Sequence, residues 1–506
     1  MKISRVFGAQ PSLIGADIVT IETDLSRGLY AFAVVGLPGK AVEEARDRIG
    51  SAIKNSGFES PKSKNHKVVI SLAPADLKKE GPVFDLPMAI GYLISSGEII
   101  AEVSTRIFVG ELALDGTLRP IRGVLPIVRE AAKRGFTEVI VPFENRDESA
   151  LIPDIIITPA RSLIDVVRHI DTSREDAHTL ESQPPTQIPN LWNEHSIRME
   201  DVRGQESAKR GLIIAAAGRH NVIMVGPPGT GKTMLARALE GILPPLTLEE
   251  ALEVTSIHSV AGTNTGISSR PPFCAPHHTA SHTSLVGGGT HPKPGEITLA
   301  HRGVLFLDEF PEFERRSIDA LRQPLEDRVV SISRVHSTVL FPADFILVAA
   351  MNPTRGGNES GDYASQMIET YKNKISGPIL DRIDLWLPVP HVDYETLTEK
   401  RDAGTKRDET SLAREQIQQA RDKQSIRLKN RGVTTNAEMS ARDIEECIEL
   451  DSSVTALLKQ SVQKLKLSPR GYHRLIKVSR TIADLDNAET IAERHVLEAL
   501  QYRMKQ

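Results

Sequence analysis

The chain has 506 residues, of which 40% are hydrophobic and 25% charged, and its formal net charge is −4. No apolar run approaches the roughly 20 residues that cross a bilayer, and the amino terminus lacks a secretory signal, so we expect a cytoplasmic protein without membrane contact. The two distant cysteines exclude a disulfide framework, and the slight negative charge confines any nucleic-acid contact to a local groove or pore.

The first part of the chain, residues 1–170, alternates strand-like and helix-like segments. Three segments have the alternation of strands and two have helical periodicity: 16–25, 66–74 and 137–143, then 40–57 and 124–135. We therefore expect a compact α/β domain. Polar residues and prolines then replace the periodic pattern, which predicts a linker at residues 171–195.

The stretch VIMVGPPGTGKT, residues 222–233, combines an apolar strand, a glycine-rich turn and the start of a helix. In such a turn, backbone N–H groups at a helix N-terminus wrap a phosphate chain. Lys232 is expected to reach the β- and γ-phosphates of ATP, and Thr233 to hold Mg²⁺. The predicted ATP site comprises Gly226, Pro227, Pro228, Gly229, Thr230, Gly231, Lys232 and Thr233.

A second apolar strand, in VLFLDEF, ends in Asp308 and Glu309. Carboxylates at the end of a buried strand are costly unless they serve a cation or a proton transfer. We expect Asp308 to contribute to the Mg²⁺ shell and Glu309 to act as general base toward the attacking water. The alternative is an ordinary acidic junction between a strand and a loop.

Residues 329–333 and 337–341 flank a short polar tip, Arg334-Val335-His336, in the pattern of a β-hairpin. Cations at this tip would contact DNA phosphates locally. If several subunits surround a pore, their phosphate contacts would sum even though the protein surface as a whole is not basic. Arg334 and His336 are therefore the predicted DNA contacts, with a solvated turn residue as the alternative for Arg334.

A third apolar strand, in FILVAAMNP, ends in Asn352, which is placed to hydrogen-bond the γ-phosphate or the attacking water. The alternative is a simple Asn-Pro turn. Three apolar strands separated by helical or irregular stretches favour a parallel sheet with crossover helices. We place this core at residues 196–391.

Two arginines follow, Arg382 in SGPILDRID and Arg470 in LSPRGYHRL. An arginine near a phosphate stabilises transition-state charge and can come from a neighbouring subunit, although either residue considered alone resembles a surface arginine in a salt bridge. The helical periodicity of residues 411–430 and 473–485 predicts an all-helical lid over residues 392–506.

In their order, these motifs resemble an AAA+ ATPase of the branch shared by magnesium-chelatase ATPase subunits and MCM helicases. Longer stretches resemble the ComM/YifB (Mg-chelatase-like) family over nearly the whole chain: VRGQESAKRGLIIAAAGRHN, APHHTASHTSLVGGG, ITLAHRGVLFLDEFPEF and GYHRLIKVSRTIADL. The resemblance implies a hexamer whose ATP hydrolysis drives branch migration or unwinding of branched or single-stranded DNA in recombination and natural transformation. It also implies that Arg382 is the arginine finger and Arg470 the second sensor, in cis or in trans.

The chain departs from this family after AAMNP. Relatives commonly continue with cysteines that resemble a zinc site, whereas this chain reads TRGGNESGD, so a structural zinc is not expected. Four histidines are the alternative ligands: His277, His278, His282 and His291.

The first domain resembles a Lon-type protease domain with a ribosomal-S5-like α/β fold, through KKEGPVFDLPMAIGYLISSG and FVGELALDGTLRPIRGVLPIVREAAKRGFTEVIVP. Peptide hydrolysis there needs a serine after Gly-Pro and a lysine in a later helix. Here residues 83–85 are Val, Phe and Asp, and Leu125 or Pro126 stands in the place of the lysine. We expect the fold without the Ser-Lys dyad.

The predicted fold class is α/β: an AAA+ P-loop core with a C-terminal helical lid, preceded by a non-catalytic Lon-like domain. The predicted function is an ATP-dependent, ring-forming DNA motor. One alternative is that the protein is a magnesium-chelatase ATPase subunit, but that function does not account for the first domain. The other is a protein-remodelling AAA+ ATPase, which the missing protease residues weaken.

Overall fold

The computed structural model describes residues 3–12, 15–63, 65–186, 192–194, 196–263, 267–289, 293–333, 338–352, 375–393 and 408–503. The chain forms two compact units, Met1–Ile188 with Thr255–Ile267 and Pro189–Val254 with Ser268–Gln506. Within the described ranges, no helix is both long enough and apolar enough to cross a membrane.

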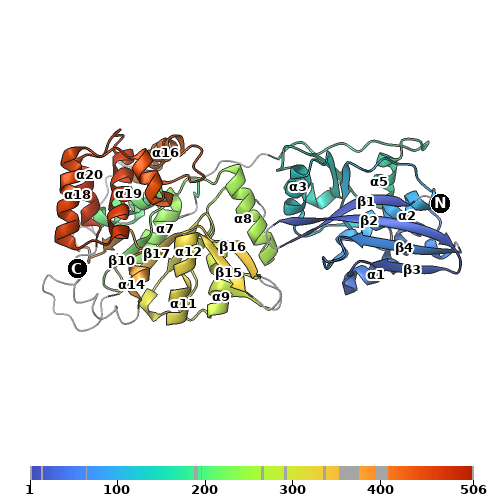
Figure 1. Ribbon diagram of the computed structural model, residues 1–506, viewed down its shortest axis with the longest axis horizontal. Helices are drawn as coiled ribbons and strands as arrows, with labels where there is room; N and C mark the ends of the chain where they lie inside the picture. Colours follow the sequence, from blue (N-terminus) through green and yellow to red (C-terminus); the bar gives the residue numbers. More distant parts are fainter. Residues whose placement is uncertain are drawn as a thin grey trace. The chain divides into compact units, whose positions relative to one another are not determined.

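A mixed seven-stranded sheet forms the first unit, with strand order β3-β4-β2-β1-β5-β8-β9 (Figure 1). Its strands are β1 (Ser4–Pro11), β2 (Ala16–Arg27), β3 (Ala31–Val35), β4 (His66–Ala73), β5 (Arg106–Phe108), β8 (Glu138–Pro142) and β9 (Ile156–Ala160). Strand β2 pairs antiparallel with β1 and β4, and the remaining pairs are parallel. Strands β6 (Glu111–Leu112) and β7 (Leu118–Arg119) form a separate pair.

Helices α2 (Asp85–Ser96) and α3 (Val124–Lys133) both pack on β1 and β2. The other helices of this unit are α1 (Lys40–Asn55), α4 (Arg146–Ser149) and α5 (Leu163–Ile170). The three strands and two helices that the sequence predicts in this part are confirmed as β2, β4, β8, α1 and α3. Burial alternates along β2 and β4, which explains why the alternation of apolar and polar residues in the sequence predicts both strands.

Apolar residues occupy the places where a Lon-type protease carries its nucleophile and base. Val83 is 5% exposed and Leu125 is fully buried, so both belong to the core. Nearby, the buried carboxylate of Asp85 accepts hydrogen bonds from Arg48 Nε at 2.9 Å and Nη2 at 3.1 Å, which commits it to an ion pair. Val83 and Leu125 therefore contribute to the packing of the unit, and removal of Arg48 would leave a buried charge without a partner. The Lon-type resemblance itself stays a prediction.

The second unit contains a five-stranded parallel sheet with strand order β11-β14-β17-β10-β18. Its strands are β10 (Val222–Val225), β11 (Phe273–Cys274), β14 (Val304–Leu307), β17 (Ile346–Met351) and β18 (Leu385–Pro388). The three predicted apolar strands are confirmed as β10, β14 and β17, and nearly all of their residues are buried. Both faces of this sheet are covered, which is why the strands read as continuous apolar runs.

Within the described residues, the helices of the predicted ATPase core are α6 (Glu206–Gly218), α7 (Lys232–Ile242), α8 (Leu248–Ala261), α9 (His282–Val286), α10 (Glu296–Leu299), α11 (Arg315–Ala320), α12 (Arg322–Asp327) and α14 (Gly377–Leu380). The part of α8 from Thr255 onward belongs to the first unit. Two short antiparallel pairs accompany them: β12 (Gly287–Gly288) with β13 (Lys293–Pro294), and β15 (Val329–Ser333) with β16 (Thr338–Pro342).

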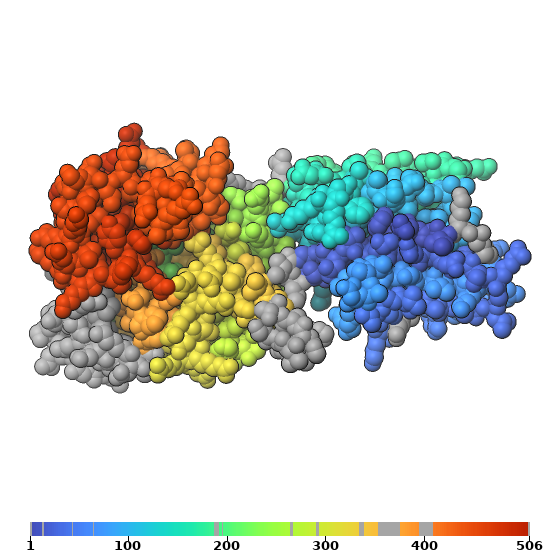
Figure 2. Space-filling model, in the orientation of Figure 1, coloured from blue at the N-terminus to red at the C-terminus, as the bar shows by residue number. Residues whose placement is uncertain are grey.

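The C-terminal region is helical, as predicted. It consists of α16 (Glu409–Arg427), α17 (Ala441–Cys447), α18 (Ser452–Leu465), α19 (Pro469–Leu485) and α20 (Glu493–Gln501). These residues, orange-red to red, form one continuous body in Figure 2. Arg421 of α16 donates to Ala216 O at 2.6 Å near the end of α6, a favourable place for a cation.

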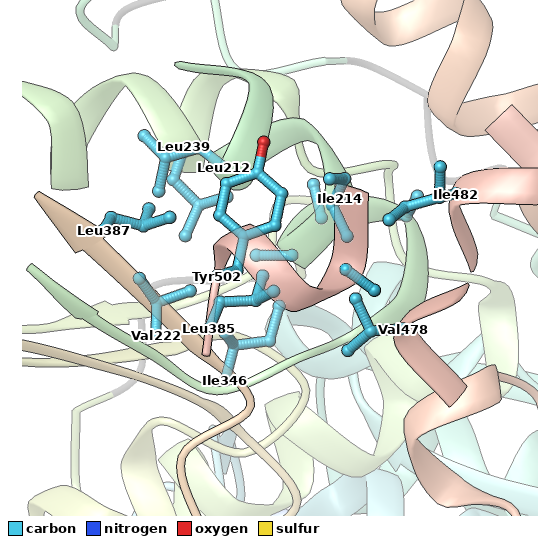
Figure 3. Packing of buried hydrophobic residues seen from close by; sticks show 14 of the residues in the cluster. Leu212, Ile214, Val222, Leu239, Ile346, Leu385, Leu387, Val478, Ile482 and Tyr502 are labelled. Atoms are coloured by element: carbon cyan, nitrogen blue, oxygen red, sulfur yellow. The ribbon is translucent and has the colours of Figure 1, made fainter. Parts of the chain in front are cut away.

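One apolar core joins the ATPase sheet to the C-terminal helices. Tyr502 lies beside side chains from β10, β17, β18, α6 and α7, and its carbonyl accepts a hydrogen bond from Trp386 N at 2.8 Å (Figure 3). Val478 and Ile482 of α19 belong to the same cluster. Helix α19, which carries Arg470, is therefore anchored directly on the ATPase core.

Candidate active site

The predicted phosphate loop is a tight turn between β10 and α7. Gly229 and Gly231 have φ angles of 81° and 88°, a left-handed conformation that favours glycine. A side chain at Gly226 would lie 2.0 Å from Val389 O, so glycine is required where the loop passes β18. Gly231 is the N-cap of α7, and the N-terminus of this helix therefore opens onto the loop.

Lys232 and Thr233 start α7 with their side chains at the loop. Lys232 Nζ donates to Gly226 O at 2.8 Å and to Pro227 O at 2.7 Å, and burial lowers the pKa of its ammonium group. Thr233 Oγ1 donates to Asp308 Oδ2 at 3.2 Å. The hydroxyl and the carboxylate are thus in contact, and oxygen ligands of this kind suit Mg²⁺. The residues present fit ATP with Mg²⁺.

Lys232→Ala should weaken ATP binding at least about 10-fold, because the phosphates lose their charge partner. Titration of the variant with a fluorescent ATP analogue would measure this, and its thermal unfolding would check that the fold persists. Lys429→Ala, which removes an exposed lysine of the same unit, is the matched control. An affinity within twofold of the parent would contradict the role of Lys232.

The phosphate loop and two polar residues follow three neighbouring strands at one edge of the sheet. The register pairs Val225 with Met351 and Leu307 with Ala349, so the residues after β10, β17 and β14 lie at the same edge. The structure thereby brings Asp308 and Asn352 to the phosphate loop. This edge of a parallel sheet is the usual place for ligands.

Glu309 turns the chain sharply after Asp308. Its φ angle is 50°, an uncommon conformation for a residue with a side chain, and its backbone N–H donates to Asp308 Oδ1 at 2.9 Å. The following residue, Phe310, is fully buried and fixes the turn. The turn separates the two acidic side chains, so that Asp308 contacts Thr233 while Glu309 stays available for a different role.

His278 contacts the predicted general base. Its Nδ1 lies 3.0 Å from Glu309 Oε2, and its ring stacks on that of His277 at a centroid distance of 4.1 Å. Both histidines follow β11, the neighbour of β14 in the sheet. The sequence suggests His278 as a metal ligand or as part of a DNA-contacting loop, and does not predict its contact with Glu309. That contact depends on the pairing of β11, a strand of two residues whose partner no local pattern reveals.

Among the described residues, no group of three or more His, Cys, Asp and Glu side chains is placed to hold a metal ion. His291 and residues 353–374, where relatives commonly have cysteines, lie outside the described ranges.

Arg382 lies at the opposite edge of the sheet from the phosphate loop. It precedes β18, which runs parallel to β10, and Asp384 accepts a hydrogen bond from Asn221 N, just before β10, at 3.1 Å. Both strands have four residues. Four residues of strand span about 13 Å. Arg382 is therefore at the amino edge, and the loop of the same chain is at the carboxyl edge.

Arg382 and Arg470 lie together. Glu326 Oε2 accepts from Arg382 Nη2, and Glu326 Oε1 accepts from Arg470 Nη2 at 2.5 Å. No sequence motif singles out Glu326. The structure thus forms two groups from the predicted residues: the loop with Asp308, Glu309 and Asn352, and the pair of arginines on Glu326.

The predicted hairpin is present. Strands β15 and β16 pair antiparallel from Val329 with Pro342 to Ser333 with Thr338. Arg334 and His336 lie outside the described residues. Their contact with DNA remains a prediction.

Comparison with known proteins finds relatives over the full length. Family models described as "Magnesium chelatase, subunit ChlI", "Subunit ChlI of Mg-chelatase" and "Magnesium chelatase, subunit ChlI C-terminal" match residues 198–397, 21–145 and 407–503. Competence protein ComM of Haemophilus influenzae is 43% identical over 510 residues, covering 99% of this chain and 98% of that protein. YifB of Escherichia coli is 42% identical, covering 99% and 97%.

Similarity to a true chelatase subunit is more restricted. The magnesium-chelatase 67 kDa subunit of Chlorobaculum tepidum is 26% identical over 203 residues, which are 39% of this chain and 27% of that protein. The full-length relatives, the parallel sheet with its phosphate loop and the helical C-terminal region agree. The chain therefore belongs to the ComM/YifB family of Mg-chelatase-like AAA+ ATPases.

Proposed function

We propose that this protein is an ATPase that assembles into a ring, by family resemblance a hexamer, and moves branched or single-stranded DNA during recombination or natural transformation. The observation that carries the proposal is the separation of Arg382 from its own phosphate loop by the length of the strands, since the two lie at opposite edges of the sheet. A neighbour's Arg382 can complete each site, as in heterologous ring interfaces. The name of the Haemophilus influenzae relative supports a role in competence.

The proposed binding step uses one subunit. The loop N–H groups and Lys232 bind the triphosphate, and Thr233 and Asp308 hold Mg²⁺, which when bound neutralises charge between the phosphates. The backbone turn at Glu309 leaves its carboxylate outside the Thr233–Asp308 contact. Asn352, at the end of the adjacent β17, is placed to orient water or the γ-phosphate.

The proposed hydrolysis step uses two subunits. Glu309 accepts a proton from the attacking water, which raises the nucleophilicity of the oxygen as it approaches the γ-phosphorus. The guanidinium of Arg382 from the neighbour offsets the charge that develops on the transferred group, and Arg470 beside it adds a second cation. Turnover then depends on contact between subunits.

DNA contact is proposed for the hairpin of β15 and β16. Arg334→Glu should reduce the ratio of DNA-stimulated to basal ATPase to about one and lower the salt dependence of DNA binding, because a phosphate contact becomes repulsive. ATPase assays with forked DNA at several salt concentrations would measure both effects.

Arg315→Glu, which makes the same charge change on exposed α11, is the control for net charge. If Arg334→Glu still responds to forked DNA like the parent, the DNA path lies elsewhere, with the first unit and the segment of residues 277–291 as the next candidates.

Two alternative functions use the same ATPase core. The first unit does not exclude a chelatase subunit, since a chelatase family model matches residues 21–145, but the 43% identity to competence protein ComM over nearly the whole chain favours a role in competence. A protein-remodelling ATPase is the other alternative. Stimulation of ATP hydrolysis by forked DNA supports the motor, stimulation by unfolded polypeptide supports remodelling, and stimulation by neither favours a chelatase-type partner.

A further inference from the structure

Glu326 links two parts of the second unit that are distant in sequence. It lies in α12, and its two carboxylate oxygens accept hydrogen bonds from Arg382 and Arg470, which is 144 residues away. Hydrogen bonding from Arg382 and the charges of Arg470 and Arg474 lower the pKa of Glu326, so the carboxylate is ionised at neutral pH. One anion thus holds both guanidinium groups.

The three residues line a cavity of about 570 Å³ in the second unit. The other acidic side chains that line it include Asp384, which pairs with Arg474 at 3.3 Å, and Asp344, which pairs with Arg219 at 3.4 Å. Asp384 is buried and Asp344 is largely buried, with 13% of its side chain exposed, and each has its own cation. Glu326 differs because its side chain is 45% exposed. The side chain of Arg470 is also exposed, at 57%. Water can reach this pair, so its partners can be exchanged.

Glu326 also lies at the base of the β15–β16 hairpin, three residues before the first residue of β15. Arg328, between them, has a φ angle of 57°. Its backbone N–H donates a hydrogen bond to Pro324 O at 3.0 Å, which caps the C-terminal end of α12. Ala343 N donates to Arg328 O at 2.7 Å, which closes the hairpin. The helix end and the hairpin base therefore share Arg328, and a shift of the hairpin base displaces Glu326.

We propose that Glu326 is a positioning residue that holds Arg382 and Arg470 together in the resting subunit and releases them when the hairpin moves. This inference rests on the proposed function, in which the arginines act on a neighbour's phosphates. Carboxylates and phosphates accept the same N–H donors of arginine. Glu326 thus competes with the γ-phosphate, and DNA at the hairpin relieves the competition.

Glu326→Gln tests this inference because it removes the charge and keeps the size of the side chain. Basal kcat should rise about 3- to 10-fold with little change in KM for ATP, and the stimulation by forked DNA should shrink, because charge-assisted hydrogen bonds to arginine are replaced by weaker neutral ones. Asp327→Asn, the same charge change one residue later in the same cavity, should leave basal kcat at the parent value.

A double variant separates positioning from a structural role. In an Arg382→Ala background, Glu326→Gln should bring no gain, because the gain passes through Arg382. Basal turnover that is unchanged or lower in Glu326→Gln, or a gain that persists without Arg382, would overturn the inference. The readout is basal ATPase activity, so it remains decisive for the hold of Glu326 on Arg382 if DNA fails to stimulate the parent. That result would count against the proposed function and against release by DNA, but not against this hold. If Glu326→Gln fails to fold, Glu326→Asp, which shortens the side chain, should also raise basal kcat, and an unchanged value would overturn the inference.

Discussion

Glu309→Gln should lower kcat at least about 100-fold while ATP still binds, because an amide cannot take the proton of the attacking water. Lys232, Thr233 and Asp308 are unchanged, so the phosphate loop and the Mg²⁺ ligands persist. The amide oxygen can accept a hydrogen bond from His278, which lies 3.0 Å from the carboxylate in the parent, so the side chain keeps its position. The loss then reports on proton transfer.

Single-turnover hydrolysis and titration with a fluorescent ATP analogue would separate chemistry from binding in this variant. Glu314→Gln, which neutralises an exposed glutamate five residues later, is the matched control and should turn over like the parent. Turnover of Glu309→Gln within about threefold of the parent would remove Glu309 from the mechanism. Loss of ATP binding together with turnover would instead assign Glu309 to the binding site.

The residues at the carboxyl edge of the sheet were predictable because each one follows its own strand. An apolar run of four to six residues that ends in Asp308 or Asn352 carries the strand and the polar residue in one local pattern. The glycines of the phosphate loop predict the turn in the same way, because the residues that form it are contiguous in sequence. The α16 and α19 helices were readable from periodicity alone.

The contacts of these residues were less predictable, because they depend on which strands are neighbours. His278 reaches Glu309 only because β11 pairs with β14, and Glu326 reaches Arg470 only because α19 packs on the ATPase core. The edge of the sheet at which Arg382 lies follows from the parallel pairing of β10 and β18. No local signal in SGPILDRID contains that information, so the sequence alone left the choice between cis and trans open.

Arg382→Ala should lower kcat by about 10³, the effect of removing an arginine that offsets transition-state charge. The variant keeps its own phosphate loop at the other edge of the sheet, so it should bind ATP normally. In a ring whose sites fire in concert, one site without its arginine also stalls its neighbours, so the variant mixed with parent subunits should depress turnover more than dilution alone predicts. A strictly proportional loss would mean that the sites turn over independently. Arg382→Lys should recover little activity, because lysine lacks the planar fork of donors.

Complementation gives the sharper test of action in trans. A Lys232→Ala subunit has lost its ATP site but offers a normal Arg382, whereas an Arg382→Ala subunit has the opposite defect. When the two inactive proteins are mixed in equal amounts, about a quarter of the sites in a ring combine an intact loop with an intact arginine, so ATPase activity should return. A mixture that remains as inactive as its components would mean that Arg382 acts within its own chain, against the separation that the parallel β10 and β18 impose.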